Sequence, residues 1–330
     1  MSRKYLYILI LGITLALNGC WVSRLAVNSI GDSIFDTPQK VTKLNNPLLD
    51  SVRISVLWAG HSTSLVQIYD KVIIFDPFFN KRFNGILLRK TELGLNVDSL
   101  KRLDAILVSH SHIDHLSFSS LDILADKFPK ATLVFPVGVE NYMPDYKINM
   151  VRVDKSDTKF KNFIGKPVYV NGLKITPVFA FHPGGRYMFD TYTWLEEGAT
   201  GYIVEYKDAC VYYAGDTGYN DKAFKVIGEN FKIDVALIPI GPCRNCDSTG
   251  IRYHTSSLES LELFKDINAQ YMIPVHYGAA RYFNDENIPF YVMNQILNDS
   301  TYSFQDIKDR VIPLKEGERI FWKEKRISDN

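Results

Sequence analysis

Short apolar runs separated by turn-forming residues recur along most of the chain and predict a series of β-strands. The predicted strands cover residues 53–58, 65–69, 72–75, 105–108, 132–135, 168–170, 174–179, 201–206, 209–213, 235–240 and 271–274. Two windows, 118–128 and 256–267, have the wider apolar spacing of amphipathic helices. Because hairpins come early and strands alternate with helices later, we predict one mixed α/β domain with its sheets inside and its helices outside.

The first twenty residues depart from this pattern. Arg3 and Lys4 precede a 13-residue apolar run over residues 5–17. A helix of that length measures about 20 Å, short of the roughly 30 Å hydrocarbon core of a bilayer, so a secretory signal is favoured over a short transmembrane anchor. The segment LNGC at residues 17–20 resembles the lipobox of bacterial lipoproteins, in which the cysteine is lipidated and becomes the mature N-terminus.

The N-terminal motif sets the predicted domain organisation. Residues 1–19 are predicted to be a signal peptide, residues 20–50 a lipidated tether or strap rich in turn formers, and residues 51–330 a single folded domain. Lipid on Cys20 would anchor the chain in the bacterial cell envelope, at the outer membrane or facing the periplasm. All later apolar stretches are too short to cross a bilayer.

Composition narrows the functional classes. The chain has 38 Lys and Arg against 37 Asp and Glu, so it lacks the basic surplus of a nucleic-acid-binding protein. Its 46% hydrophobic and 13% aromatic residues are typical of a folded chain. Four cysteines are too few for a disulfide framework. The pair Cys243 and Cys246 leaves open a local disulfide or two free thiols, and the oligomeric state is open as well.

A cluster of histidines follows directly after the predicted strand 105–108. Residues 109–115 read SHSHIDH, which places three imidazoles and a carboxylate within six residues. Such groups are unfavourable neighbours unless something binds them, and together they suit zinc, iron or manganese. Strand alternation puts His110 and His112 on one side, whereas Asp114 and His115 turn with the loop and can serve a second metal.

This motif resembles the one that marks the metallo-β-lactamase superfamily, whose four-layer αββα sandwich holds one or two metals between its sheets. Three further landmarks follow in that family's order: His182, Asp216 in the segment AGDTGY and His276 in the segment IPVHYG. The resemblance implies two divalent metals, with zinc expected and iron or manganese as alternatives. It assigns metal one to His110, His112, His182 and Asp216, and metal two to Asp114, His115, Asp216 and His276.

Other motifs are similar to the branch that contains N-acyl-phosphatidylethanolamine-hydrolysing phospholipase D. They are WAGHS at residues 58–62, Asp76-Pro77, GDTGY at residues 215–219 and HPGGR at residues 182–186. This resemblance implies a phosphodiesterase that acts on a phospholipid or a related phosphodiester. Residues 183–185 and 242–252 differ from that branch where a substrate would be chosen. The resemblance therefore supports the type of reaction more strongly than the identity of the substrate.

The implied mechanism uses a water shared by two cations roughly 3.5–4 Å apart, whose pKa falls from about 15.7 towards about 7. Asp114 would bind metal two and orient the resulting hydroxide. His254, ahead of a predicted helix, would take part in catalysis or touch the substrate, and Arg186 would pair with a phosphate. His61 would support a metal ligand from behind. Each of the last three residues also has a purely structural alternative. His254 could be an ordinary surface histidine, Arg186 could form a salt bridge, and His61 could be a core histidine.

Three other functions stay open at this stage. A lactonase or carboxylic-ester hydrolase would use the same pair of metals. A β-lactamase is supported by the metal core alone. A non-catalytic envelope lipoprotein would have no need for seven intact ligand positions, which argues against it.

Overall fold

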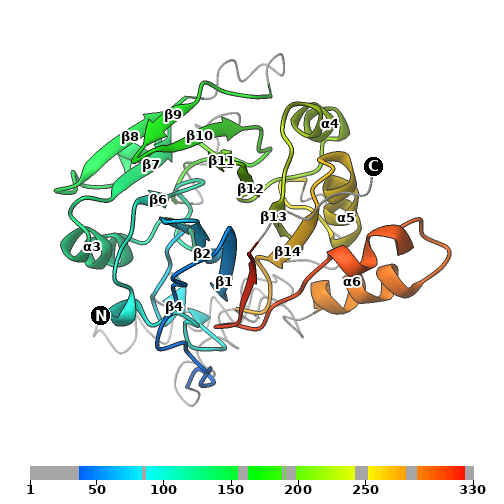
Figure 1. Ribbon diagram of the computed structural model, residues 1–330, viewed down its shortest axis with the longest axis horizontal. Coiled ribbons are helices and arrows are strands. Elements are labelled where there is room, and N and C mark those ends of the chain that lie inside the picture. The colour runs from blue at the N-terminus through cyan, green and yellow to red at the C-terminus, as the bar shows by residue number, and fades with distance from the viewer. Residues whose placement is uncertain are drawn as a thin grey trace, which may run out of the picture.

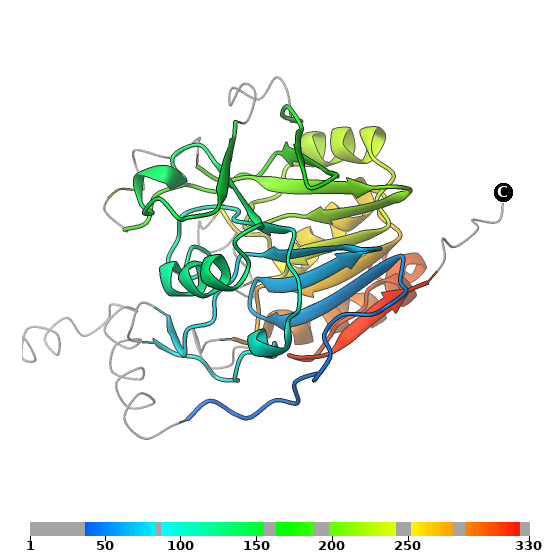
Figure 2. The ribbon, with the colours of Figure 1, turned by 60° about the vertical axis from the view of Figure 1, so that its left-hand side comes forward.

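The computed structural model describes residues 37–83, 87–154, 163–187, 190, 198–241, 252–279 and 288–323. Two β-sheets face each other at its centre, with helices on both outer sides (Figures 1 and 2). This arrangement confirms the predicted αββα sandwich. The predicted signal peptide, Cys20, Cys243 and Cys246 lie outside the described residues, so the predictions that concern them stay predictions.

The first sheet has seven strands in the order β15-β1-β2-β3-β6-β7-β8. Its strands are β1 (Ile54–Gly60), β2 (Thr63–Ile68), β3 (Lys71–Phe75), β6 (Ala105–Leu107), β7 (Thr132–Pro136), β8 (Asn149–Val153) and β15 (Arg319–Trp322). The strands from β15 to β3 pair antiparallel, and those from β3 to β8 pair parallel. Strands β4 (Arg82–Phe83) and β5 (Leu87–Leu88) form a separate small hairpin.

The second sheet has six strands in the order β14-β13-β12-β11-β10-β9. Its strands are β9 (Val168–Val170), β10 (Leu173–Val178), β11 (Gly201–Tyr206), β12 (Ala209–Tyr213), β13 (Val235–Pro239) and β14 (Tyr271–Val275). The pairs from β9 to β12 are antiparallel, whereas β12, β13 and β14 run parallel. Because parallel strands end at a common edge of a sheet, the loops that follow β12, β13 and β14 lie at the same edge.

Alternating side chains divide the first sheet between two cores. In β3, Ile73 and Phe75 pack into the core shared with the second sheet, while Val72 and Ile74 pack on the opposite face. That outer face is covered by α3 (Phe118–Lys127). Because both faces of each central strand are covered, the strands read as continuous apolar runs rather than as alternating ones.

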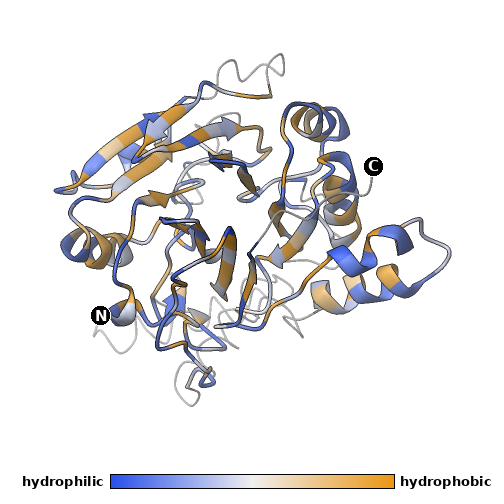
Figure 3. Cartoon of the chain, in the orientation of Figure 1, coloured by the Kyte–Doolittle hydropathy of each residue, from blue (hydrophilic) through white to orange (hydrophobic). Residues whose placement is uncertain are grey.

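Three helices cover the second sheet: α4 (Asp221–Asn230), α5 (Ser257–Asp266) and α6 (Ile288–Asn298). They combine hydrophobic and hydrophilic positions, whereas most strand positions are hydrophobic (Figure 3). The predicted helix near residues 256–267 is confirmed as α5. Ser256 and Glu259 form a capping box at its start, which satisfies amide groups that the first turn leaves unpaired.

The hydrophobic pattern missed the elements whose burial depends on distant partners. The predicted strands and both predicted helices are present, but β4, β5, β8, β15, α4 and α6 were not predicted. β15 pairs with β1 across most of the chain, with Trp322 opposite Ile54. β8 is a partly exposed edge strand, and Asn149 and Arg152 interrupt its short apolar run, so the pattern does not distinguish it from a loop. Short 3₁₀ helices lie at Val97–Ser99, Val139–Asn141 and Gln305–Arg310.

Residues 37–50 lie along the surface of this domain. Gln39 exchanges backbone hydrogen bonds with the segment after β5, and Leu49 donates its amide to the Gln67 side chain. Arg319 donates to the carbonyl of Asn46. Within the described part of the chain, no helix is both long enough and apolar enough to cross a bilayer.

A buried arginine joins the two sheets at the edge where β1 begins. The Arg53 side chain is 4% exposed and its Nη2 donates to Asp234 Oδ2 at 2.9 Å, while Nε donates to Asp208 Oδ2 at 3.0 Å. Asp234 Oδ2 also accepts the amide of Cys210 at 2.8 Å. Arg53 precedes the first sheet, and its partners precede β12 and β13 of the second.

Replacing this arginine tests the inter-sheet contact. We expect Arg53→Ala to lower the free energy of unfolding by about 3–5 kcal/mol, because it leaves the Asp234 carboxylate buried without its cation. Guanidinium denaturation measures the change. Lys225→Ala, which breaks an exposed pair with Asp221 on α4, is the control and should leave stability unchanged. Equal effects of the two substitutions would contradict this role for Arg53.

Candidate metal centre

The predicted metal ligands come from loops at one end of the sandwich. The histidine-rich loop follows β6 of the first sheet, and Asp216 follows β12 of the second. His276 comes directly after β14, whose C-terminal end lies at the same edge as that of β12. His182 follows β10, and the bridge between Phe181 and Gly218 ties its segment to the loop of Asp216. Loops from both sheets therefore meet at one place.

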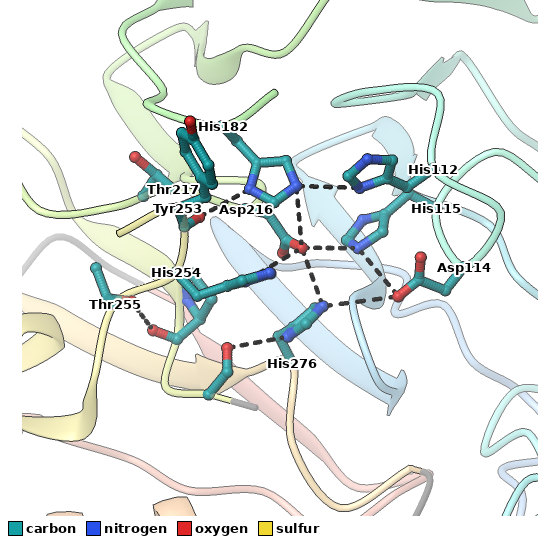
Figure 4. Close-up of polar contacts among 12 residues, drawn as sticks. His112, Asp114, His115, His182, Asp216, Thr217, Tyr253, His254, Thr255 and His276 are labelled. Atoms are coloured by element: carbon teal, nitrogen blue, oxygen red, sulfur yellow. Dashed lines mark hydrogen bonds and ion pairs between the residues drawn. The ribbon is translucent and has the colours of Figure 1, made fainter. Parts of the chain in front are cut away.

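Asp216 lies at the centre of this meeting point (Figure 4). Its carboxylate is 3% exposed. Its Oδ2 atom faces ring nitrogens of five histidines, at 3.1 Å from His276 Nε2, 3.2 Å from His115 Nε2, 3.6 Å from His254 Nδ1 and 4.0 Å from both His110 Nε2 and His182 Nε2. A single carboxylate oxygen thus faces ligands that the sequence assigned to both metals.

The first predicted ligand set converges on one side of Asp216. His112 Nδ1 lies 2.9 Å from His110 Nε2 and 3.0 Å from His182 Nε2. These three nitrogen atoms lie close enough to bind one ion. The structure therefore brings together His110, His112, His182 and Asp216, as expected for metal one.

The second predicted set converges on the other side. Ligand atoms of Asp114, His115 and His276 lie together with His61 within 4.8 Å of one another. Asp114 Oδ2 is 3.7 Å from His115 Nε2 and 3.9 Å from His276 Nε2. Their role as ligands of metal two stays a prediction, but their proximity is a property of the fold.

Hydrogen bonds behind the rings orient four of these histidines. Each uses Nδ1 to contact an outer partner and turns Nε2 inwards. The contacts are His110 with Ser109 Oγ at 2.9 Å, His115 with Asp76 Oδ2 at 2.7 Å, His182 with Tyr253 O at 2.7 Å and His276 with Gly241 O at 3.2 Å. Such contacts fix the ring and the tautomer that present a lone pair to a metal.

Asp76 is a functional residue that the sequence prediction used only as part of a motif. It is fully buried, directly after β3, with its backbone in the left-handed region at φ 40°. Its carboxylate accepts the Ser109 amide at 2.7 Å, the Ser109 hydroxyl at 2.6 Å, His115 Nδ1 at 2.7 Å and the Tyr213 hydroxyl at 2.5 Å. A carboxylate directly after a buried apolar strand was the signal that could have identified it.

Burial and mutual charge set the titration of these groups. Burial opposes ionisation of Asp216, yet the neighbouring His115 and His276 hold its pKa well below the usual range. Burial likewise opposes protonation of His115, but Asp216, Asp114 and Asp76 raise its pKa well above the usual value. For His110, burial and the charge of neighbouring histidines both lower the pKa. Burial therefore favours the neutral form of His110, whereas the surrounding carboxylates favour the charged form of His115.

The unpaired atoms of this cluster fit a divalent cation. His115 Nε2, His254 Nδ1, His276 Nε2 and Asp216 Oδ1 are buried and have no hydrogen bond of suitable geometry. Leaving buried polar atoms unpaired is costly, so their convergence indicates a ligand that takes several lone pairs at once. Imidazole nitrogen and carboxylate oxygen are donors that zinc, iron and manganese accept.

The remaining predicted residues surround this cluster. His61 is 1% exposed and its Nε2 lies 3.0 Å from Asp114 Oδ2. His254 precedes α5, stacks on His276 with ring centroids 5.5 Å apart and is 19% exposed, so solvent reaches it. Burial lowers the pKa of His254 to about 4 and that of His61 to about 3. The Arg186 guanidinium contacts backbone carbonyls of Ser111 and Leu116.

Comparison with known proteins identifies the family. The model of the Beta-lactamase superfamily domain matches residues 71–277, which include the histidine-rich loop, His182, Asp216 and His276. The chain belongs to the beta-lactamase superfamily. The superfamily domain thus spans every residue that the sequence assigned to the two metals.

Curated relatives agree with this assignment. A UPF0173 metal-dependent hydrolase from Saccharolobus solfataricus is 31% identical over 67% of this chain and 83% of its own length. The N-acyl-phosphatidylethanolamine-hydrolyzing phospholipase D 1 of Caenorhabditis elegans is 28% identical over 67% of this chain and 63% of its own length. An uncharacterized Mycobacterium tuberculosis protein is 26% identical over 70% of this chain. This chain spans about 60% of the length of the mycobacterial relatives that it matches.

Solved structures show the same fold. A metallo hydrolase from Ignicoccus hospitalis superimposes with a TM-score of 0.55 at 20% identity, covering 82% of this chain and 99% of that one. This likeness supports the fold, and the converging His and Asp groups make the centre of this superfamily domain a candidate metal site.

The role of Asp76 can be tested by substitution. We expect Asp76→Asn to weaken zinc binding about 10–100-fold, because a neutral amide no longer supports His115 as a carboxylate does. Competition with a chromogenic chelator measures the affinity. Asp122→Asn, on the exposed side of α3, is the matched control. Unchanged affinity in the Asp76 variant would show that His115 is oriented by other contacts.

Proposed function

We propose that this protein is a phosphodiesterase that acts on a phospholipid or a related phosphodiester. The observation that carries the proposal is the position of Asp216, whose Oδ2 faces both ligand groups at once. A carboxylate shared in this way suits two cations, an arrangement used by phosphatases and nucleases. The C. elegans relative named for phospholipase D supports a phosphodiester as substrate.

The residues divide into groups with separate tasks. His110, His112 and His182 would hold one cation, Asp114, His115 and His276 the other, and Asp216 both. When bound, such cations supply an activated water and neutralise negative charge that develops on the substrate. The chain itself supplies the orientation, because the ring nitrogens are aimed by contacts behind them.

Asp114 and His254 have the positions expected of residues that contact the reacting groups. Asp114 is 25% exposed, and its Oδ2 is held by His61 at 3.0 Å, so the carboxylate has a fixed direction and access to solvent. It would orient the attacking water. His254 stacks on His276 at the solvent side and would donate a hydrogen bond to a substrate oxygen.

The proposed location is the bacterial cell envelope. The apolar run at residues 5–17 and the LNGC segment support a lipid anchor at Cys20. Residues 37–50 run along the catalytic domain, so such an anchor would be connected to it by a short link. An enzyme anchored in this way would act on lipid without needing a strongly basic surface.

A second candidate, a lactonase or carboxylic-ester hydrolase, is favoured by one observation. Arg186, the residue expected to pair with a phosphate, instead directs its Nη1 to two backbone carbonyls. The same pair of cations would serve an ester carbonyl equally well.

Metal dependence tests the catalytic proposal. We expect chelation, and separately Asp216→Ala, to lower kcat/KM at least about 100-fold, because the cations supply several kcal/mol of stabilisation in the transition state. Metal content by mass spectrometry and activity are measured together, with Asp221→Ala as a surface control. Less than one metal per chain, or an Asp216→Ala variant with full metal and full activity, would overturn the proposal.

Substrate panels distinguish the two candidates. We expect the metal-loaded protein to release phosphatidic acid from a bacterial lipid extract, as followed by mass spectrometry, with Asp216→Ala as the inactive control. Lactones and phosphodiesters are assayed side by side. Turnover of lactones only would replace the phosphodiesterase proposal with the lactonase.

A further inference from the structure

One arginine connects the two segments that carry most of the predicted ligands. Arg186 lies four residues after His182, and its Nη1 donates to the carbonyls of Ser111 at 3.1 Å and Leu116 at 2.8 Å. Ser111 precedes His112, and Leu116 follows His115. The two carbonyls therefore stand on either side of the stretch that contributes His112, Asp114 and His115.

We propose that Arg186 is a positioning residue that holds the loop of residues 111–116 in its metal-binding shape, rather than a ligand of a substrate phosphate. The inference rests on the metal centre and is independent of which ester the enzyme hydrolyses. It extends to both candidate reactions, since each needs the same ligands in place.

The hydrogen-bond inventory of the guanidinium supports this role. Nη1 carries two N–H groups, and each has a backbone carbonyl as its acceptor. The fork formed by Nη1 and Nη2, which would grip a phosphate with two parallel bonds, is thereby occupied on one side. The Arg186 guanidinium therefore bridges two points of one loop.

The arginine is itself held from two directions. Its guanidinium carbon lies 4.0 Å from the centroid of the Phe118 ring, in the first turn of α3. Its backbone amide donates to Asp190 Oδ2 at 3.1 Å. A planar cation stacked on an aromatic ring has few other orientations, so the donor atoms have a defined position.

The loop has a second connection to the same segment. Ser111 Oγ donates to the carbonyl of Gly185 at 2.6 Å. Within the loop, the amides of His115 and Leu116 both donate to the carbonyl of His112. These bonds form a turn, but neither amide bond connects the turn to the segment of His182. Arg186 supplies that connection at both ends of the turn.

The consequence is a coupling between two sets of ligands. His182 would bind metal one, whereas Asp114 and His115 would bind metal two. With Arg186 in place, the distance between these segments is fixed by hydrogen bonds that do not involve the metal. Small displacements of ligands weaken both metal binding and catalysis, as seen for contacts that orient metal ligands elsewhere.

The test compares Arg186→Gln, Arg186→Lys and Phe118→Leu in the full chain, with Arg152→Gln on β8 as the control. Arg152 is 51% exposed and pairs with Glu140, away from the metal centre. Zinc affinity is measured by chelator competition, and the ligand geometry by the visible absorption of the cobalt-loaded protein. kcat and KM are measured with bis-p-nitrophenyl phosphate and with p-nitrophenyl acetate, and thermal unfolding is followed in parallel.

We expect Arg186→Gln to weaken zinc binding about 10–100-fold and to change the cobalt spectrum. At saturating metal it should lower kcat by the same factor for both substrates, with KM nearly unchanged. Arg186→Lys should recover most of both losses, because an ammonium group can still donate to two carbonyls. Phe118→Leu should act in the same direction but more weakly.

Two results would overturn the inference. A rise in KM for the phosphodiester alone, with unchanged zinc affinity, would show that Arg186 binds phosphate. Lower thermal stability with an unchanged cobalt spectrum would show a purely structural role. If neither substrate is hydrolysed, the proposed function fails, while the zinc and cobalt measurements still decide the role of Arg186.

Discussion

The structure of this site depends on one constraint: buried imidazoles and carboxylates cannot share a small volume unless their lone pairs and charges are compensated. Five histidine nitrogens face one oxygen of Asp216, within 3.1–4.0 Å. Asp216 and His276 are each 3% exposed, so little of either side chain is open to water. A divalent cation is the compensation that suits this donor set, and the S. solfataricus relative is named as a metal-dependent hydrolase.

Residues around the cluster hold the predicted ligands in place through hydrogen bonds. Asp76 aims His115 and binds Ser109, which in turn contacts His110. His61 holds Asp114. The backbones of His61, Asp76 and His276 all lie in the left-handed region, which disfavours residues other than glycine and is maintained only by surrounding structure. The two packed sheets supply that rigid surrounding.

Much of this could be predicted from the chain, because the relevant signals are local. The SHSHIDH loop places its donors within a few bonds of one another, and apolar runs identify buried strands without knowledge of their partners. β15 could not be predicted in this way, since its four residues become a strand only by pairing with β1, far away in the sequence. The same holds for Asp76, whose four donors belong to three residues, Ser109, His115 and Tyr213, on two segments that meet only in the fold.

Arg186 shows where the sequence stops being informative. Its spacing from His182 is a sequence property and indicated a phosphate contact, but the direction of its guanidinium is decided by Phe118, Ser111 and Leu116. The sequence by itself therefore determined the superfamily and the sandwich fold. It also predicted which residues would bind metal. Only the tertiary structure decided which atoms face the centre and which residues hold them there. The reason is physical: residue type and spacing are carried by the covalent chain, whereas side-chain direction follows from packing between segments that meet only in the fold.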